Sequence, residues 1–481
     1  MTLLLGLYIS YIAIAIFIIV AVDLIITILI KNRLKQLQEK VNNLVLQKEE
    51  SEAAPSSDDA PDKEASTEPK IAVIEKPDGE TQKADTPLKT NKEKVLEAIL
   101  EIKEVQEEDL PKVCKALSGY YAKYANEDYI KDLSSKSYFR FIDLSSQRDT
   151  RVVIIGDIHS DYNSLAALLL KLTASEYDYF DKAIFIFLGD YLDRGSTLFE
   201  PLMLLKSLTE ILGDRMIMLK GNHESIRYDS DIQKIATRVM PNQSCQCLNE
   251  YCGNEKDFLQ QFAVFYSRLP IYVYLKTKEK NILLTHAAIP RDTSQESILF
   301  DENSGAIIFD NSVPVTNRLQ MRNTILKDMI WGDPKNCDRK IQMEGRFEFG
   351  RLQFDHFAQR NHIDILFRSH EEVPSGYQSF FDDRVFTIFS TGGSENNQTG
   401  YPSVEPAFAI IQNERIVIEN SYIYKSRKDG KQIMLNLFNK QIYTDKQQEG
   451  LSLGEEFECN QEQRDDIRSV FKHIKAFFSN D

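Results

Sequence analysis

The chain of 481 residues is long enough for two ordinary domains or for one large domain with appendages. Its hydrophobic fraction of 42% and aromatic fraction of 10% allow a substantial core. The net charge of −15 argues against broad binding to nucleic acid, because such binding needs a basic surface that neutralises phosphates. We therefore expect a protein with a globular core and no nucleic-acid partner.

The N-terminal segment predicts a transmembrane helix over residues 3–30. Its first part, from Leu3 to Val22, is almost entirely apolar, and about 20 such residues cross a bilayer core. A cleaved signal peptide is the alternative, but no basic residue precedes the run and no clear cleavage site follows it. By the positive-inside rule, the side after the span is cytoplasmic, since that side begins with Lys31, Arg33, Lys35 and Lys40.

Residues 31–48 predict a juxtamembrane helix. Apolar residues recur there with the spacing 3, 4, 3, at Leu34, Leu37, Val41 and Leu44. Two heptads are too short for an independent coiled coil, but beside a membrane helix they could support a homodimer through residues 34–44. A simple helical extension is the alternative.

The next segment, residues 49–91, predicts a disordered acidic linker. It has no aromatic residue, is rich in acidic residues, and carries prolines at positions 55, 61, 69, 77 and 87. Such a segment cannot bury enough apolar surface to offset the entropy of ordering. We expect a folded domain over residues 92–430 and a polar extension over 431–481 that ends in an amphipathic helix.

Apolar runs and helical patterns alternate at the start of the predicted domain. Strands are expected at 152–155, 183–188 and 215–219, with helices at 165–172 and 199–212 between them. This order implies parallel strands that are buried on both faces. The later strand-like runs often lack an intervening helix; they are 271–275, 281–285, 364–367, 385–390, 408–412 and 415–419. The fold class is therefore α/β, with two mixed sheets flanked by helices.

Polar clusters follow five of these runs. They are GDIHSD, GDYLDRG, GNHES, His286 and RSHEE. Ligands of open α/β sheets bind beyond the carboxyl ends of strands, so the clusters can converge on one place. Any one cluster also has a simpler reading, such as a turn in which Asp157 or Asp161 caps the next helix.

Together the clusters contain the donors of a two-metal site, which are Asp157, His159, Asp190, Asn222, His286 and His370. Carboxylate, amide and imidazole donors suit Mn, Fe or Zn better than Ca or Mg. One carboxylate, Asp190, would bridge ions about 3.5–4 Å apart. Glycines at 156, 189 and 221 would allow the sharp turns. The histidines outside the clusters, His356, His362 and His473, are expected to be structural.

In their order along the chain, GDIHS, GDYLDRG, GNHE, THAA and RSH resemble the motifs of the phosphoprotein phosphatase family of calcineurin-like metallophosphoesterases. The resemblance covers about residues 110–425 and includes MIWGDP (329–334) and the segment 376–390. It implies the metallophosphoesterase αβ sandwich and hydrolysis of phosphomonoesters on phosphoproteins. Phosphoserine and phosphothreonine are the expected substrates, with phosphotyrosine as an alternative.

The same resemblance implies roles for individual residues. One metal ion would bind Asp157, His159 and Asp190, and the other would bind Asp190, Asn222, His286 and His370. A hydroxide that bridges the two ions would attack phosphorus in line. The leaving alkoxide would receive a proton from His223, oriented by Asp193. The phosphate oxygens would be held by Arg194, with Arg346 in EGRFEFG as a second candidate.

The chain departs from the family pattern at four places: Ser160 replaces a glycine, Ala287 follows His286, the loop STGGSEN (390–396) lacks a tyrosine, and CQCLNEYC (245–252) looks like an insertion. A dinucleoside polyphosphate or nucleotide hydrolase is the second reading, although Asp193 favours the phosphatase, since those hydrolases usually carry alanine there. A catalytically dead membrane scaffold is the third, and the intact ligand set argues against it.

The six cysteines are too sparse for a disulfide scaffold. Three of them, Cys245, Cys247 and Cys252, form a loose cluster. We expect reduced thiols in a surface loop; a zinc site is the alternative and lacks a nearby fourth ligand.

Overall fold

The structure is a computed structural model that describes residues 89–421, except 103, 126–137, 148, 256, 292–293, 295–297, 310–312, 341–345 and 395. The predicted transmembrane helix, the juxtamembrane helix with its dimer segment, the C-terminal extension and nearly all of the linker lie outside the described residues. None of the helices in the described part of the chain is long and apolar enough to cross a membrane.

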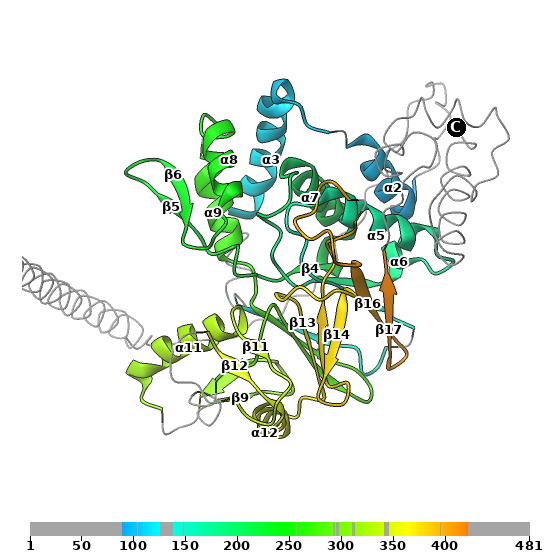
Figure 1. Cartoon of the computed structure of the whole chain (residues 1–481), viewed down its shortest axis with the longest axis vertical. Helices are drawn as coiled ribbons and strands as arrows, with labels where there is room; N and C mark the ends of the chain where they lie inside the picture. The colour runs from blue at the N-terminus through cyan, green and yellow to red at the C-terminus, as the bar shows by residue number, and fades with distance from the viewer. Residues whose placement is uncertain are drawn as a thin grey trace, which may run out of the picture. The chain divides into compact units, whose positions relative to one another are not determined.

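Two mixed sheets form the centre of the domain (Figure 1). The five-stranded sheet has the order β17-β16-β2-β3-β4, with strands Arg415–Asn420, Ala407–Gln412, Val152–Ile155, Ile184–Phe187 and Met216–Met218. The six-stranded sheet has the order β1-β7-β8-β13-β15-β14, with strands Phe139–Asp143, Tyr272–Lys276, Asn281–Thr285, Ile365–Arg368, Val385–Ile388 and Tyr377–Phe380. Strands β2, β3 and β4 are parallel, whereas β16 is antiparallel to β2. The predicted mixed topology is confirmed.

Alternating side chains of the buried strands serve two cores. In β2, Ile154 points into a core shared by both sheets, where it joins residues such as Leu284 and Phe367. Its neighbours Val153 and Ile155 point to the opposite side and pack against helices. A strand buried on both faces needs apolar residues at successive positions, which explains the run VVII.

Helices cover the outer face of each sheet (Figure 1). The outer core of the five-stranded sheet is shared with α2 (Asn91–Glu101), α3 (Leu110–Ala125), α5 (Tyr162–Ala174), α6 (Tyr179–Lys182), α7 (Phe199–Leu212) and α9 (Phe258–Ser267). Of these helices, α2 packs on α5, α6 and α7, and α3 packs on α7 and α9. The six-stranded sheet is covered by α11 (Val315–Met329) and α12 (Arg351–Asn361). Helix α2 begins with a capping box in which Thr90 Oγ1 accepts from the amide of Glu93.

The remaining elements are short. They are η1 (Glu107–Asp109), η2 (Gly213–Arg215), the hairpin β5 (Ile226–Asp229) and β6 (Lys234–Thr237), α8 (Gln243–Tyr251), the hairpin β9 (Ile298–Phe300) and β10 (Ile307–Phe309), and the pair β11 (Asp333–Pro334) and β12 (Glu348–Phe349).

The prediction of reduced thiols in a surface loop is wrong for Cys252 and for the loop itself, and it is confirmed for the thiols of Cys245 and Cys247. The segment expected as a loop forms α8, and Cys252 at its C-terminus is joined by a disulfide to Cys114 of α3. Both cysteines are fully buried, whereas Cys245 and Cys247 are free. The pairing could not be predicted because the two cysteines are 138 residues apart, and proximity follows only from the packing of α3 beside α8.

Candidate metal centre and active site

The six predicted metal ligands lie together at the carboxyl ends of β2, β3, β4, β8 and β13. Five of the six are no more than 3% exposed, and His370 is partly buried. Because these ends meet where the two sheets face each other, residues as far apart in the sequence as Asp157 and His370 become neighbours: the amide of His370 donates to Asp157 Oδ1 at 3.2 Å.

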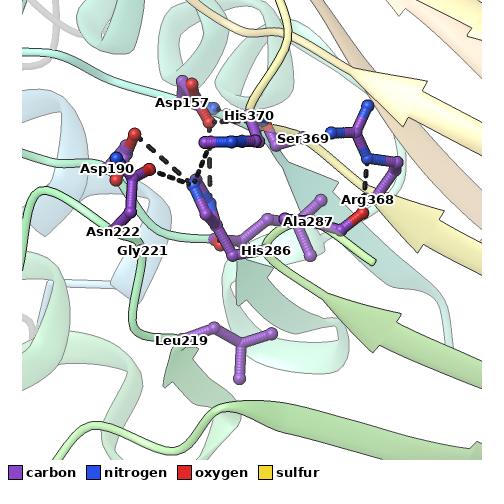
Figure 2. A network of polar contacts seen from close by, with 12 residues as sticks. Asp157, Asp190, Leu219, Gly221, Asn222, His286, Ala287, Arg368, Ser369 and His370 are labelled. Carbon is purple, nitrogen blue, oxygen red and sulfur yellow. Dashed lines mark hydrogen bonds and ion pairs between the residues drawn. The ribbon is translucent and has the colours of Figure 1, made fainter. Parts of the chain in front are cut away.

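Three of the ligands surround His286 (Figure 2). Its Nε2 lies 3.0 Å from Asn222 Oδ1 and 3.1 Å from His370 Nδ1. The distance from the same nitrogen to Asp190 Oδ2 is 3.4 Å. These four side chains are the set predicted for one of the two ions.

The other predicted set meets at His159. Its Nε2 lies 3.3 Å from Asp157 Oδ2 and 3.6 Å from Asp190 Oδ2. The same Asp190 oxygen therefore faces both histidines. Among the described residues, two groups have donor atoms within 4.8 Å of one another: His159 with Asp190 and His223, and Asp190 with His286 and His370. Asp190 belongs to both groups, as a bridging carboxylate requires.

Backbone carbonyls orient two of the imidazole rings. His159 Nδ1 lies 2.9 Å from the carbonyl of Leu192, and His286 Nδ1 lies 2.9 Å from that of Leu188. A carbonyl only accepts, so each Nδ1 donates and each Nε2 keeps a free lone pair in the neutral ring. This arrangement is typical of metal-binding histidines.

Two buried atoms of the predicted metal ligands have no hydrogen-bond partner in the described part of the protein. Asp157 Oδ2 and His370 Nε2 are buried and make no hydrogen bond. Leaving such atoms unpaired costs free energy, which a bound cation would recover. Together with the mixed carboxylate, amide and imidazole donors, they fit a pair of divalent transition-metal ions.

Charge coupling is strong at this site. Burial opposes protonation of His286, but the carboxylates of Asp190, Asp157 and Glu224 together outweigh it and raise the pKa of His286 to about 9. Burial likewise opposes ionisation of Asp190, yet His286 and His223 hold its pKa well below the usual range. Burial and the neighbouring His286 lower the pKa of His370. Asp190 is thus held as a carboxylate that attracts cations.

A buried glutamate, Glu224, holds the turn that carries Asp190. Its Oε2 accepts from the amides of Asp190 and Gly221, both at 2.9 Å. Burial and the nearby Asp190 raise the pKa of Glu224 to about 8. A Cβ on Gly221 would lie 2.1 Å from Asp190 Oδ1, so only glycine fits there.

The prediction that glycines make the sharp turns holds for Gly189 alone, whose φ is 113°. Gly156 and Gly221 do not have positive φ; they are needed because other atoms approach closely. The left-handed conformation at the first cluster falls instead on His159 (φ 47°) and Ser160 (φ 52°). Asp161 caps α5 through the amide of Ser164 at 3.1 Å, so the capping reading of GDIHSD is correct. The cap leaves Asp157 and His159 out of its contacts, so it is compatible with the metal reading, which stays a prediction.

The predicted acid and its orienting residue form a buried pair. His223 Nδ1 lies 2.7 Å from Asp193 Oδ2. The His223 ring is 5.0 Å from the ring of His159, measured between centroids, which places it beside the metal ligands. The pair is therefore positioned to transfer a proton at the edge of the site.

The two arginines predicted to bind phosphate differ in their surroundings. Arg194 is exposed, and its guanidinium lies 5.8 Å from the ring centroid of Tyr401. Arg346 is engaged with Asp333 at 2.6 Å and donates to the carbonyl of Trp331 at 2.7 Å. Of the two, Arg194 is the arginine whose guanidinium is exposed and not engaged in an ion pair with a carboxylate of the described residues. The phosphate-binding role of each arginine stays a prediction.

Three supporting residues escaped the sequence analysis. The hydroxyl of Ser369 lies 2.5 Å from Asp157 Oδ1. Arg368 is fully buried and donates to the carbonyl of Ala287, which ties the ends of β8 and β13 together (Figure 2). It also donates to Asp333 in β11. The sequence did offer one signal for Arg368, since this charged residue directly follows the apolar run DILF. Tyr401 places its ring 5.5 Å from that of His159, and it follows the loop that lacks the family tyrosine.

Comparison with known proteins gives concordant results. Residues 150–374 match the calcineurin-like phosphoesterase family model. The chain is 27% identical over 274 residues to the serine/threonine-protein phosphatase 4 catalytic subunit of Eremothecium gossypii, covering 56% of this chain and 78% of that one. With the corresponding subunit of Saccharomyces cerevisiae it shares 26% identity over 248 residues, or 51% and 70% of the two chains.

Among solved structures, one similar chain is a protein serine/threonine phosphatase from Saccharomyces cerevisiae that is described as similar to human phosphatase PP5. It shares 18% identity, with a TM-score of 0.47 and coverage of 69% of this chain and 94% of that chain. The family match shows a calcineurin-like metallophosphoesterase domain over residues 150–374, and the chain is similar in sequence to the two serine/threonine-protein phosphatase catalytic subunits named above.

Proposed function

We propose that this chain is a phosphoprotein phosphatase that hydrolyses phosphoserine and phosphothreonine esters. The observation that carries the proposal is the buried pair of His223 and Asp193, 2.7 Å apart, beside six convergent metal donors. A serine or threonine alkoxide is a strongly basic leaving group, and its departure needs a positioned acid. The names of the curated relatives support the same substrate class.

Two divalent ions would be held by Asp157, His159 and Asp190 on one side and by Asp190, Asn222, His286 and His370 on the other. When bound, such ions supply a nucleophile at neutral pH and neutralise phosphate charge. The carbonyls of Leu188 and Leu192 keep His286 and His159 in the tautomer that binds metal.

The protein's own residues then act on the substrate. Asp193 accepts from Nδ1 of His223, which leaves Nε2 to carry the proton for the leaving oxygen. Arg194 is exposed at the site and offers the planar fork of donors that suits a phosphate group. Arg346 would add a second contact only by leaving Asp333, its present partner.

A direct test uses the purified full chain in detergent, loaded with Mn²⁺. Phosphoserine, phosphothreonine and phosphotyrosine peptides are compared with diadenosine tetraphosphate at equal enzyme concentration. We expect kcat/KM to be highest for the phosphoserine or phosphothreonine peptide. Preference for the dinucleotide would support the alternative hydrolase, and inactivity on all four with metal bound would support a scaffold.

The membrane tether and the homodimer through residues 34–44 belong to the same proposal. They are supported by the apolar run from Leu3 to Val22 and by the heptad spacing that follows it. The basic residues after the run support a cytoplasmic domain. The disulfide between Cys114 and Cys252 supports the opposite side, since disulfides are rare in the cytosol.

A further inference from the structure

Two consecutive residues of the active site have a left-handed backbone. Asp193 has φ 66° and Arg194 has φ 68°. Residues with a Cβ adopt this conformation at a cost in free energy, and they keep it only where their surroundings enforce it. One of these residues orients His223 and the other is the proposed phosphate contact, so whatever enforces their conformation also positions the chemistry.

Helix α8 supplies that constraint through its first two residues, Gln243 and Ser244. The amide of Asp193 donates to Ser244 Oγ, and the amide of Arg194 donates to Gln243 Oε1, both at 2.8 Å. Each peptide N–H of the left-handed pair is thus bound by one side chain. About fifty residues separate the partners in the sequence, so the contacts depend on the tertiary fold.

Ser244 also fixes the carboxylate of Asp193. The amide of Ser244 donates to Asp193 Oδ1 at 2.8 Å, while Oδ2 faces Nδ1 of His223 at 2.7 Å. All three residues are no more than 3% exposed. The amides of a first helical turn have no partner within the helix and carry partial positive charge, which makes them suitable partners for a carboxylate. Rotation of the Asp193 side chain would break both contacts.

The remainder of α8 is anchored to the domain. Leu248 is fully buried, and the side chain of Asn249 bonds both the amide and the carbonyl of Ile235 in β6, at 2.9 and 2.8 Å. At the C-terminus, Cys252 is linked to Cys114 of α3. A helix held at both ends and along its side gives its first two residues a defined position.

We propose that Ser244 and Gln243 are positioning residues. Ser244 holds the imidazole of His223 through Asp193, and Gln243 holds Arg194. The inference rests on the proposed function, because it deepens the roles given there to His223 and Arg194. It assigns separate tasks to two adjacent side chains, and those tasks can be separated by kinetics.

The kinetic test compares Ser244→Ala and Gln243→Ala in the full chain with Mn²⁺, using a phosphoserine peptide and p-nitrophenyl phosphate. The aryl leaving group is far less basic than an alkoxide and depends less on an acid. We expect Ser244→Ala to lower kcat on the peptide roughly tenfold and to change kcat on the aryl ester little. Gln243→Ala should raise KM and the inhibition constant of inorganic phosphate while kcat stays nearly the same.

Conservative variants and a control separate positioning from general damage. Ser244→Thr keeps the hydroxyl, so its kcat should equal that of the wild type. Gln243→Glu keeps the acceptor oxygen, so its KM should equal that of the wild type. Gln246→Ala, an exposed change on the same helix, should have no effect. When Ser244→Ala is added to His223→Ala, kcat on the peptide should fall no further than in His223→Ala alone. Equal losses on both substrates, or a further loss in that background, would overturn the inference for Ser244.

A spectroscopic measurement keeps this inference separate from the proposed function. In ¹H NMR, the Nδ1 proton of His223 should give a downfield resonance that is identified by its absence in His223→Ala. We expect the resonance in the wild type and in Ser244→Thr, and its loss or shift in Ser244→Ala. If the wild type hydrolyses neither substrate, the proposed function fails, while an unchanged resonance in Ser244→Ala would overturn the positioning role by itself.

Discussion

His223 and Asp193 form a buried hydrogen bond, with 2.7 Å between Nδ1 and Oδ2, and no more than 2% of either residue is exposed. The bond leaves the other ring nitrogen of His223 free and fixes the direction in which it points. The pair lies beside the metal donors, since the amide of His223 donates to Asp190 Oδ1 at 2.9 Å. A direct hydrogen bond therefore connects the backbone of the proposed acid to the proposed bridging carboxylate.

The first prediction concerns this acid. His223→Ala and Asp193→Asn should each lower kcat for a phosphoserine peptide by about 10²–10⁴-fold, the range for loss of a general acid. Metal content, measured by inductively coupled plasma mass spectrometry, should stay at the wild-type value. Asp382→Asn is the control, because this exposed carboxylate pairs only with Arg351 among the ion pairs of the described residues. Unchanged turnover in His223→Ala would show that another group donates the proton.

The second prediction concerns the frame of Asp190. A methyl group at position 221 would meet Asp190 Oδ1 at 2.1 Å and the Asp190 amide at 2.3 Å. Gly221→Ala should therefore lower both the metal bound per chain and the activity. Gly119→Ala in α3 is the matched control, since nothing lies within 4 Å of its new methyl group. That change should raise the free energy of unfolding by about 0.4–1 kcal/mol and leave metal binding intact. Full metal occupancy in Gly221→Ala would contradict the proposed geometry.

The third prediction concerns the disulfide between Cys114 and Cys252. Its loss, by reduction or in Cys114→Ala, should lower the free energy of unfolding by about 2–5 kcal/mol, because the bond closes a long loop in the unfolded chain. Urea denaturation with and without dithiothreitol measures the difference. Cys337→Ser, at an exposed free cysteine, should change the free energy of unfolding by less than about 0.5 kcal/mol. Free thiols at 114 and 252 in non-reducing peptide mapping would refute the pairing.

The fourth prediction concerns the side of the membrane. Asn397-Gln-Thr is a glycosylation sequon, and Asn397 is exposed in the structure. With the cytoplasmic orientation that we propose, Asn397 stays unmodified when the full chain is expressed in a eukaryotic host. Glycosylation there, removed by Asn397→Gln and by glycosidase treatment, would place the domain on the lumenal side, where the disulfide is stable.

Helices and strands with a clear run or period of apolar residues were predicted correctly from the sequence. The helix expected at 199–212 is α7, and the strand expected at 281–285 is β8. Elements defined by distant partners were missed. Strand β1 pairs with β7, more than a hundred residues later, and β11 pairs with β12 over two residues only. Helix α12 lacks a clear apolar pattern, because its sequence RLQFDHFAQRN carries many polar residues.

The convergence of the six proposed metal ligands could be predicted from the sequence, because each of them follows a strand of a recognisable kind. What the sequence could not supply was the support around them. The carbonyls that fix His159 and His286 belong to Leu192 and Leu188, and any residue type offers a carbonyl. The contacts of Gln243 and Ser244 also depend on how α8 packs, and nothing in the local pattern marks them.

The relative kcat/KM of the Mn²⁺-loaded full chain on a phosphoserine peptide and on diadenosine tetraphosphate tests the proposed activity most directly. We predict a higher value for the peptide and its collapse in His223→Ala, with the metal content unchanged. A higher value for the dinucleotide, unaffected by the loss of His223, would contradict the assignment of this site to phosphoprotein hydrolysis.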